Sequence, residues 1–493
     1  MKLGFDNEKY IQMQSERIRE RIDNAGNKLY LEFGGKLFDD YHASRVLPGF
    51  APDVKIRMLS ALADKAEIII VISATDIENN KIREDLGITY EADILRLIDA
   101  FRSFGLAVTG IVLTRYNEMK SSDQFIERME SLDMKVYKHY SIEGYPGDIP
   151  HIVSESGYGK NEYIETTRPL VVVTAPGPGS GKMATCLSQL YHENKRGIKA
   201  GYAKFETFPV WNLPLTHPVN LAYEAATADL NDINMIDPFH LEANGETAVN
   251  YNRDVEIYPV LAAMMRKIMG ECPYKSPTEM GVNMAGKCIF DDDIVREAAK
   301  AEIIRRYFSA LCDKASGHGS NDAITKLKIV MQRAGVTEND RRVVGEARVK
   351  ETECGKPAVA IELEDGRIIT GKASELMSAE TAALINALKA LGDIQDRIHI
   401  IPPLIFEPIQ KLKQLETSSQ ARRLTAGEAL IAISISATTN PLAQIVVDQI
   451  PKLKGLEAHS SVISLREDRE MLKKLGIRLS MEPKYETKRL FHR

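Results

Sequence analysis

Hydrophobic residues along the chain gather in short runs, and between these runs apolar positions recur at helical spacing. Helical spacing is found in segments 8–23, 54–65, 91–103, 122–132 and 181–195. The strand-like runs are 28–33 (KLYLEF), 67–73 (EIIIVIS), 107–114 (AVTGIVLT), 134–139, 170–174 (LVVVT) and 199–204 (KAGYAK). Buried strands that alternate with helices form parallel sheets covered on both faces. Residues 1–210 are therefore predicted to form one doubly wound, mostly parallel α/β domain.

The remaining chain changes character twice. Residues 211–340 are mixed and polar at first, then helical over 292–312 and 321–334, and are predicted to be a helical insertion that packs on the first domain. Residues 341–493 are predicted to form a second, smaller α/β domain. It opens with a hairpin, 358–363 and 367–370, around Glu364-Asp365-Gly366. Its other expected elements are helices over 378–391, 425–436, 440–451 and 466–475, and strands over 398–401 and 460–465.

Composition excludes several classes of protein. The chain has 493 residues, of which 44% are hydrophobic and 27% charged, which is typical of a globular protein with a real core. The net charge of −5 is too balanced for a broad basic face on nucleic acid or an anionic membrane. No apolar run approaches the roughly 20 residues that span a bilayer, and the N-terminus lacks the apolar region of a signal peptide. The five cysteines are scattered without a CxxC pair, so reduced thiols and a cytoplasmic location are expected.

The sharpest motif runs from a predicted buried strand through a glycine-rich loop into a predicted helix, over residues 171–185 (VVVTAPGPGSGKMAT). Glycines let main-chain amides turn inward around a phosphate, and a helix N-terminus adds partial positive charge. A lysine at the start of that helix supplies a cation to the outer phosphates. The residues expected to bind a phosphorylated cofactor are Gly177, Gly179, Ser180, Gly181, Lys182 and Thr185.

This motif departs from the usual phosphate loop at two positions. Pro176 stands where the pattern has its first glycine, and Met183 stands where it has the hydroxyl residue that holds Mg²⁺. Thr185 is one candidate to replace that hydroxyl. Two other interpretations stay open: a tight strand–helix turn that needs glycines only for packing, and a loop that binds an anion without turnover.

A second group of candidates lies in the polar stretch 204–254, which also holds the only tryptophan. Lys204 is expected to stabilise developing negative charge, and His217 to act as an acid or base. Glu206 is a further catalytic candidate. Asp229, Asp232 and Asp237 are predicted to hold Mg²⁺, because hard cations prefer carboxylate oxygens. For any one of these residues, capping a helix or forming a turn is the alternative.

Residues 173–205, which end in Gly201-Tyr202-Ala203-Lys204, resemble the dethiobiotin synthetase and CTP synthetase group of P-loop ligases. In that group a strand, a long variant phosphate loop ending in Gly-Lys, a helix and a second strand with a Tyr-Lys-like end follow in order. The resemblance implies that Lys182 cradles phosphates and that Lys204 neutralises an anionic substrate or phosphate. Met183 departs from the group's hydroxyl residue.

The whole chain resembles an uncharacterised bacterial family known only as a domain of unknown function. That resemblance implies no chemistry, since no activity is assigned to the family. It is carried by residues 30–36, 175–185, 201–212, 237–252 and 455–460.

Together these patterns predict an enzyme that binds a nucleotide or phosphate, either an ATP-dependent ligase or a kinase-like phosphoryl-transfer enzyme. ATP and Mg²⁺ are the expected cofactors, and no zinc, haem or flavin signal is present. A transferase or hydrolase of a phosphorylated small molecule, without NTP hydrolysis, is the first alternative. A non-enzymatic ligand-sensing or assembly protein is the second. The expected partner is a phosphorylated small molecule or nucleotide, not nucleic acid or a membrane, and a homo-oligomer is left open.

Overall fold

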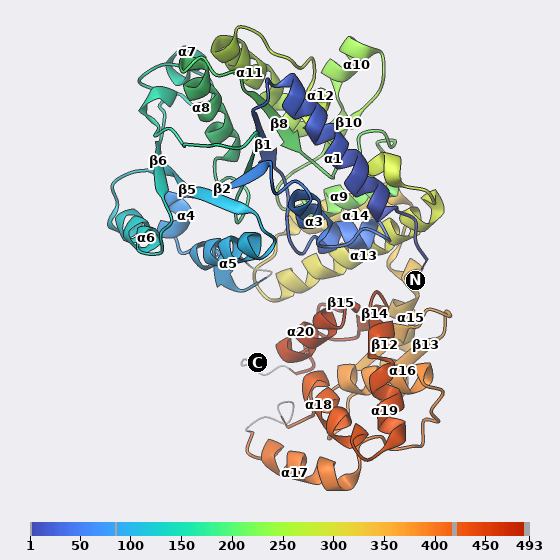
Figure 1. Cartoon of the computed structure of the whole chain (residues 1–493). Coiled ribbons are helices and arrows are strands. Elements are labelled where there is room, and N and C mark those ends of the chain that lie inside the picture. Colours follow the sequence, from blue (N-terminus) through green and yellow to red (C-terminus); the bar gives the residue numbers. More distant parts are fainter. Residues whose placement is uncertain (1, 84–85, 417–421, 488–493) are drawn as a thin grey trace. The chain divides into compact units, whose positions relative to one another are not determined.

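The chain folds into two compact units, each with its own sheet and core. The computed structural model describes residues 2–83, 86–416 and 422–487 (Figure 1). The first unit comprises Leu3–Tyr223 and Asp232–Arg296, and the second comprises Glu224–Asn231 and the chain from Glu297 onward. The division into parts at residues 210 and 340 stays a prediction.

A seven-stranded sheet forms the centre of the first unit, and each ladder in it is parallel. All eight residues of its strand β2 are buried, as expected for a strand covered on both faces. In spatial order the strands are β11 (Gly281–Val282), β8 (Gly201–Phe205), β1 (Leu29–Phe33), β7 (Leu170–Thr174), β2 (Ala66–Ser73), β5 (Ala107–Tyr116) and β6 (Val136–Tyr140).

Helices cover this sheet on both faces (Figure 1). On one face Tyr30, Val173 and Tyr202 form a single core with α8 and α11. On the other, Phe33 stacks on Phe205 at 4.0 Å between ring centroids, and the Lys55 ammonium of α3 lies 5.8 Å from the Phe205 ring. The helices of this unit are α1 (Asn7–Asn24), α2 (Tyr41–Val46), α3 (Val54–Ser60), α4 (Ala74–Glu78), α5 (Tyr90–Ser103), α6 (Lys120–Glu130), α7 (Ile149–Ile152), α8 (Lys182–Lys195), α10 (Pro238–Asn244), α11 (Asn252–Met269) and α12 (Pro277–Met280).

The strand order creates two places where a ligand crevice is expected. The connection after β7 leads to β8 on one side, whereas the connection after its neighbour β2 leads to β5 on the other. The same divergence occurs between β8, which is followed by β11, and β1, which is followed by β2. In open α/β sheets, ligands bind outside the carboxyl ends of strands at such switch points. The glycine-rich loop follows β7, and Lys204 and Glu206 stand at the end of β8.

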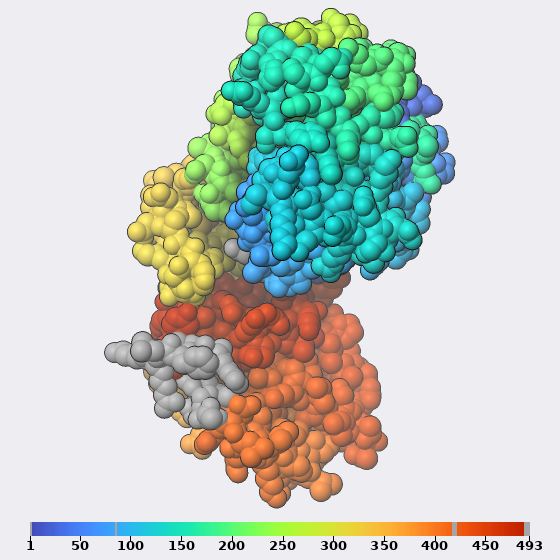
Figure 2. Space-filling model, turned by 90° about the vertical axis from the view of Figure 1, so that its left-hand side faces the viewer, coloured from blue at the N-terminus to red at the C-terminus, as the bar shows by residue number. Residues whose placement is uncertain are grey.

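Small antiparallel pairs complete the first unit. β3 (Ile82–Arg83) pairs with β4 (Ile88–Thr89), and β9 (Asn234–Ile236) pairs with β10 (Val249–Tyr251). In Figure 2 the residues that follow β2, coloured blue to teal, cover the face of this unit turned to the viewer. No helix in the described part of the chain is long and apolar enough to cross a membrane.

The second unit is built around a four-stranded mixed sheet in the order β13-β12-β14-β15. Small residues such as Ala383, Ala387 and Ala426 lie in its core and let the helices pack closely. The strands are β12 (Ala358–Glu362), β13 (Ile368–Lys372), β14 (Glu457–Ser460) and β15 (Arg478–Met481). The helices are α14 (Asn321–Ala334), α15 (Arg342–Cys354), α16 (Ala379–Leu391), α17 (Pro403–Lys413), α18 (Ala426–Ala437), α19 (Pro441–Asp448) and α20 (Arg466–Lys474), and α9 (Pro218–Ala226) and α13 (Asp292–Ala315) run from the first unit into the second.

The structure corrects three expectations. Residues 398–401 form no strand, because this apolar run anchors a loop on the core and is followed by two prolines, which end any ladder. The strand expected at 460–465 lies earlier, at Glu457–Ser460. The helix expected over 54–65 is also shorter, since α3 ends at Ser60.

Candidate functional site

The glycine-rich loop, residues 175–181, joins β7 to α8 and, with the first turn of α8, presents main-chain amides that have no acceptor among the described residues. Among the described residues, none accepts a hydrogen bond from the amides of residues 179–184. Gly181 has φ of 97° and Gly179 has φ of 74°, a region that disfavours other residues. Successive free amides at a helix N-terminus form an anion-binding concavity.

Contacts within the unit hold this loop in place. The Ser180 hydroxyl donates to the Gly177 carbonyl at 2.6 Å, and the Thr114 hydroxyl of β5 donates to the Ser180 carbonyl at 2.6 Å. A Cβ at Gly177 would lie 2.1 Å from the Tyr90 hydroxyl oxygen, so this position requires glycine. The Ser180 hydroxyl therefore holds the loop in shape. The contribution of Ser180 to anion binding would come from its main-chain amide.

Lys182 begins α8 and is half-buried. Among the described residues it has no hydrogen-bond or ion-pair partner. Burial lowers the pKa of its ammonium, Glu32 on β1 opposes that change, and Lys204 adds to it. An ammonium that is desolvated and unpaired gains from an anionic ligand.

Hydroxyl and carboxyl groups without a hydrogen-bond partner also occur near the end of β7. Thr185 is fully buried in the first turns of α8, and Ser73 ends the neighbouring strand β2; each has a buried hydroxyl that bonds to no described residue. Asp76 opens α4 just after β2, and its Oδ2 is likewise buried and unbonded. Its Oδ1 lies 3.1 Å from Lys81 Nζ, which is 4.9 Å from the centre of the Tyr90 ring.

A second group, termed the lysine–acid cluster, comprises Lys204, Glu206, Tyr251 and Asp254. The Lys204 ammonium bonds to the Asp254 carboxylate and to the Tyr251 hydroxyl, and it lies 3.0 Å from Glu206 Oε1. About 10% of each of the three charged side chains is exposed, so water screens them little. Lys204 lies on β8, and Glu206 is the residue that follows this strand. Tyr251 is the last residue of β10, and Asp254 lies in the first turn of α11.

The two acids of the lysine–acid cluster differ in pKa: that of Glu206 is raised and that of Asp254 is lowered. Burial opposes the charge on Lys204, yet Asp254, Tyr251 and Glu206 together raise its pKa well above the ordinary value. Asp254 stays ionised because Lys204 and its hydrogen bonds lower its pKa against the effect of burial. Burial raises the pKa of Glu206 to about 8, with Lys204 opposing and the charge of Asp254 adding to the shift. Glu206 is thus a protonated carboxylic acid at neutral pH, which can donate a proton.

Glu32 lies between the loop and the lysine–acid cluster. It is on β1, between β7 and β8, in register with Val173 and Lys204. The Tyr202 hydroxyl donates to its Oε2 at 2.6 Å. Its negative charge raises the pKa of both Lys182 and Lys204. Two lysines, Lys182 and Lys204, and three acids, Glu32, Glu206 and Asp254, are therefore electrostatically linked near the carboxyl ends of adjacent strands.

His217 does not join this arrangement. Its Nδ1 accepts from the Val219 amide at 3.2 Å, and its Nε2 lies 3.0 Å from Asp292 Oδ1. Burial lowers its pKa. Both ring nitrogens are engaged in holding the start of α9 against the start of α13.

The three aspartates predicted to bind Mg²⁺ are not gathered into a site. Asp237 is a helix cap that accepts from the amides of Phe239 and His240 and from the Thr278 hydroxyl. Asp232 pairs with Arg253 at 2.6 Å. Asp229 is exposed and belongs to the second unit. Within the described ranges, no three His, Cys, Asp or Glu residues are placed to hold a metal ion.

Sequence reasoning did not identify several residues that the fold brings to this region. Asp254 lay in the polar stretch, but its pairing with Lys204 joins residues 50 positions apart. Asp76 follows a buried strand, and acids in that position are a usable signal for a ligand site. Glu32, Tyr90 and Tyr251 gave no local signal.

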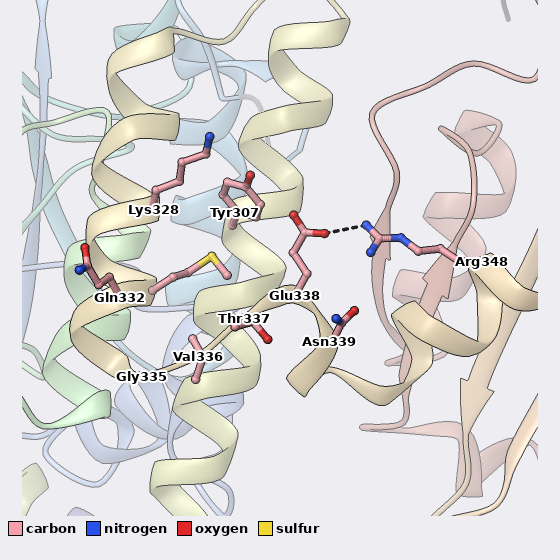
Figure 3. Close-up of a pocket in the computed structure, with 10 residues that line it drawn as sticks. Tyr307, Lys328, Gln332, Gly335, Val336, Thr337, Glu338, Asn339 and Arg348 are labelled. Carbon is pink, nitrogen blue, oxygen red and sulfur yellow. Dashed lines mark hydrogen bonds and ion pairs between the residues drawn. The ribbon is translucent and has the colours of Figure 1, made fainter.

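A cavity of about 620 Å³ lies in the second unit, and none of the predicted site residues line it (Figure 3). It is a shallow depression between α13, α14 and α15. The Arg348 guanidinium and the Glu338 carboxylate pair at 2.7 Å on its wall. Neither the glycine-rich loop nor the lysine–acid cluster lines this cavity.

Comparison with known proteins covers both halves of the chain. Residues 3–335 match the family described as domain of unknown function DUF1846, N-terminal, and residues 339–491 match its C-terminal counterpart. The chain is 54% identical over 492 residues to UPF0371 protein DIP2346 of Corynebacterium diphtheriae, covering 100% of this chain and 99% of that protein. It is 52% identical to a UPF0371 protein of Clostridium botulinum and 51% identical to UPF0371 protein SUB1165 of Streptococcus uberis, each over the full length of both chains. With both halves matched and identity above one half, the chain is a member of the two-domain DUF1846 family.

Proposed function

We propose that this protein is an enzyme that binds the phosphate groups of a nucleotide or a phosphorylated small molecule at the glycine-rich loop. The observation that carries the proposal is the run of free amides at residues 179–184, beside the unpaired ammonium of Lys182. A helix N-terminus, inward-turning amides and a partly desolvated cation are the elements that stabilise a phosphate.

The lysine–acid cluster supplies the proposed chemistry. Lys204 stabilises negative charge that develops on the transferred group, and it is held in position by Asp254. Glu206, protonated near neutral pH, delivers a proton to the leaving oxygen. With ATP as the ligand, the charge-stabilising role of Lys204 is the one expected in a ligase or a kinase-like enzyme.

ATP is normally bound together with Mg²⁺, and oxygen atoms near the loop would be the ligands of that ion. The Asp76 carboxylate and the hydroxyls of Ser73 and Thr185 have oxygens without a hydrogen-bond partner among the described residues, and they are the groups of this chain that would hold the ion. Bound Mg²⁺ would neutralise charge on the transferred phosphate. Thr185 in this role takes the place of the hydroxyl that Met183 lacks.

A second candidate is a transferase or hydrolase that acts on a phosphorylated small molecule without NTP hydrolysis. Two observations favour it: Met183 replaces the usual Mg²⁺-binding hydroxyl, and Asp232 and Asp237 are engaged elsewhere. In this reaction the loop holds the phosphate of the substrate itself, while Glu206 serves as the acid.

A thermal-shift screen tests the proposal. The purified chain is heated with ATP, GTP, inorganic phosphate and phosphosugars, each with and without Mg²⁺, and a ligand that binds the folded state raises its melting temperature. Lys182→Ala should abolish the shift, whereas Lys195→Ala, on the exposed far end of α8, should retain it. Mg²⁺ dependence and turnover favour the first candidate. Binding without turnover would favour a sensing protein, and no shift with any compound would refute phosphate binding.

A further inference from the structure

A small cavity of about 130 Å³ lies beside the edge strand β11. Glu206, the residue that follows β8, is part of its lining. We term it the α1 cavity, because Arg17 and Arg21 of α1 form one wall. They are one helical turn apart and so project from the same face of the helix. Glu206, Trp211, His240 and Asn250 are among the residues that line the rest.

The α1 cavity is rich in hydrogen-bond donors that have no acceptor. Arg17 Nη1 pairs with Glu20 at 2.7 Å and Arg21 Nη2 donates to the Glu279 carbonyl, but the Nε atoms of both arginines are buried and bond to no residue that the structure describes. His240 Nδ1 lies 3.1 Å from the Ser276 hydroxyl and 3.2 Å from the Asn244 amide nitrogen, a donor, and this arrangement favours the tautomer that carries its N–H at Nε2. Glu206 lines the same wall, and its protonated carboxyl group donates to the Asp254 carboxylate of the lysine–acid cluster.

The acceptors on the wall are mostly committed to other groups. Glu279 accepts from the Asn244 amide at 2.9 Å and from the Lys275 main-chain amide at 2.7 Å. Asn250 Oδ1 accepts from the Tyr251 amide at 2.8 Å. Buried donors without acceptors carry a free-energy cost that a ligand with acceptor oxygens removes. Guanidinium groups favour planar oxyanions, which they bind through two parallel hydrogen bonds.

We propose that the α1 cavity binds the carboxylate group of a small organic acid. Arg17 and Arg21 provide the charge, and His240 provides a further donor. The volume is well below the roughly 300 Å³ of the smallest drug-sized pockets, so the ligand is a compound of few atoms. Glu206 also lies 3.0 Å from Lys204, so the bound acid stands next to the lysine–acid cluster. Its role as the second reactant rests on the proposed function, but the binding itself does not.

Trp211 makes this proposal directly measurable, because it is the only tryptophan of the chain and it lines the α1 cavity. Its fluorescence is recorded while the full-length protein is titrated with acetate, malonate, L-aspartate, L-glutamate and citrate. L-asparagine and L-glutamine serve as amide controls, and inorganic phosphate as a non-carboxylate oxyanion. The expected result is a saturable change with at least one carboxylate and none with the matching amide.

Variants locate the binding. Arg17→Gln and Arg21→Gln should each weaken the response at least tenfold, and Arg19→Gln, exposed on the other side of α1, should leave it unchanged. Arg21 also lies over the Tyr274 ring, so Arg17→Gln is the variant that keeps the test valid if Arg21→Gln does not fold. Lys182→Ala should bind the carboxylate normally while losing its response to phosphate compounds, which separates failure here from failure of the proposed function.

Three results would overturn the proposal. One is the absence of a saturable response to every carboxylate. Another is an equal loss in Arg19→Gln, which would indicate a general effect of charge. The third is an arginine-dependent response to inorganic phosphate alone, which would assign the cavity to a different oxyanion.

Discussion

Replacing Glu206 by glutamine should make the first unit more stable at pH 8 than the wild-type protein, although it removes a charged residue from an ion pair. Glutamine has the shape of the protonated acid but cannot ionise. Glu206 has about 10% of its side chain exposed, and burial raises its pKa from 4.5 to about 8. A shift of this size corresponds to about 5 kcal/mol at full ionisation.

The direction follows from proton binding. Below pH 4.5 both the folded and the unfolded chain keep the proton of Glu206, so the variant and the wild type should be similar. Between pH 4.5 and 8 the unfolded chain releases the proton and the folded chain keeps it, so wild-type stability falls by about 1.4 kcal/mol per pH unit. Asp254 titrates together with Glu206 and its charge adds to this shift, so we expect a net gain of about 2–5 kcal/mol for Glu206→Gln at pH 8.

Urea unfolding followed by Trp211 fluorescence measures this difference, since the only tryptophan lies in the first unit. Curves are recorded at several pH values between 5 and 8 at fixed ionic strength. Glu242→Gln, an exposed acid of the same unit, is the control and should show no such pH dependence. A difference between Glu206→Gln and wild type that stays constant with pH, or that grows more destabilising as pH rises, would show that Glu206 is an ordinary ionised partner of Lys204.

Three further predictions concern other parts of the structure. Gly177→Ala should destabilise the loop by about 1–3 kcal/mol, because its Cβ would meet the Tyr90 hydroxyl at 2.1 Å; thermal unfolding should show recovery in the double variant with Tyr90→Ala, and an equal loss in both would contradict this contact. Asp254→Asn should cost about 3–5 kcal/mol in urea unfolding by leaving the buried Lys204 charge without its main partner, and a loss below about 1 kcal/mol would mean that the pair is solvated. In the second unit, burial and the charge of Glu380 raise the pKa of Asp468 from 3.8 to about 7, so Asp468→Asn should raise the melting temperature at pH 8, with a gain that shrinks as the pH falls and disappears below pH 3.8; the reverse pH trend would refute the shift.

Local patterns predicted the elements well where a segment is both long and strongly apolar. The strand Leu170–Thr174 and the helix Asn321–Ala334 lie within the predicted bounds, because hydrophobic runs and helical spacing reflect burial directly. The order of strands was not accessible. β7 pairs between β1 and β2, which precede it in the chain by more than 90 residues, and nothing within the strands encodes that choice.

The same distinction applies to the candidate site: residues close together in sequence could be predicted, and pairs that only the fold brings together could not. Gly181 and Lys182 could be found because their chemistry is contiguous in sequence. The partner of Lys204 could not, since Asp254 is one of many polar residues in its stretch and only the fold selects it. The ion pairing of Asp232 and the capping by Asp237 show the converse: acidic residues are common in turns and caps, and spacing alone does not separate those roles from metal binding.

The central claim, that the free amides of the glycine-rich loop bind phosphate, is tested most directly by hydrogen exchange at those amides. Peptides covering residues 175–185 are followed by mass spectrometry with and without ATP and Mg²⁺, and separately with inorganic phosphate. The account predicts fast exchange at residues 179–184 in the free protein, because these amides have no acceptor among the described residues, and marked protection when a phosphate compound is bound. Lys182→Ala should remove the protection. A phosphate ligand that binds and stabilises the protein while these amides continue to exchange freely would contradict the account.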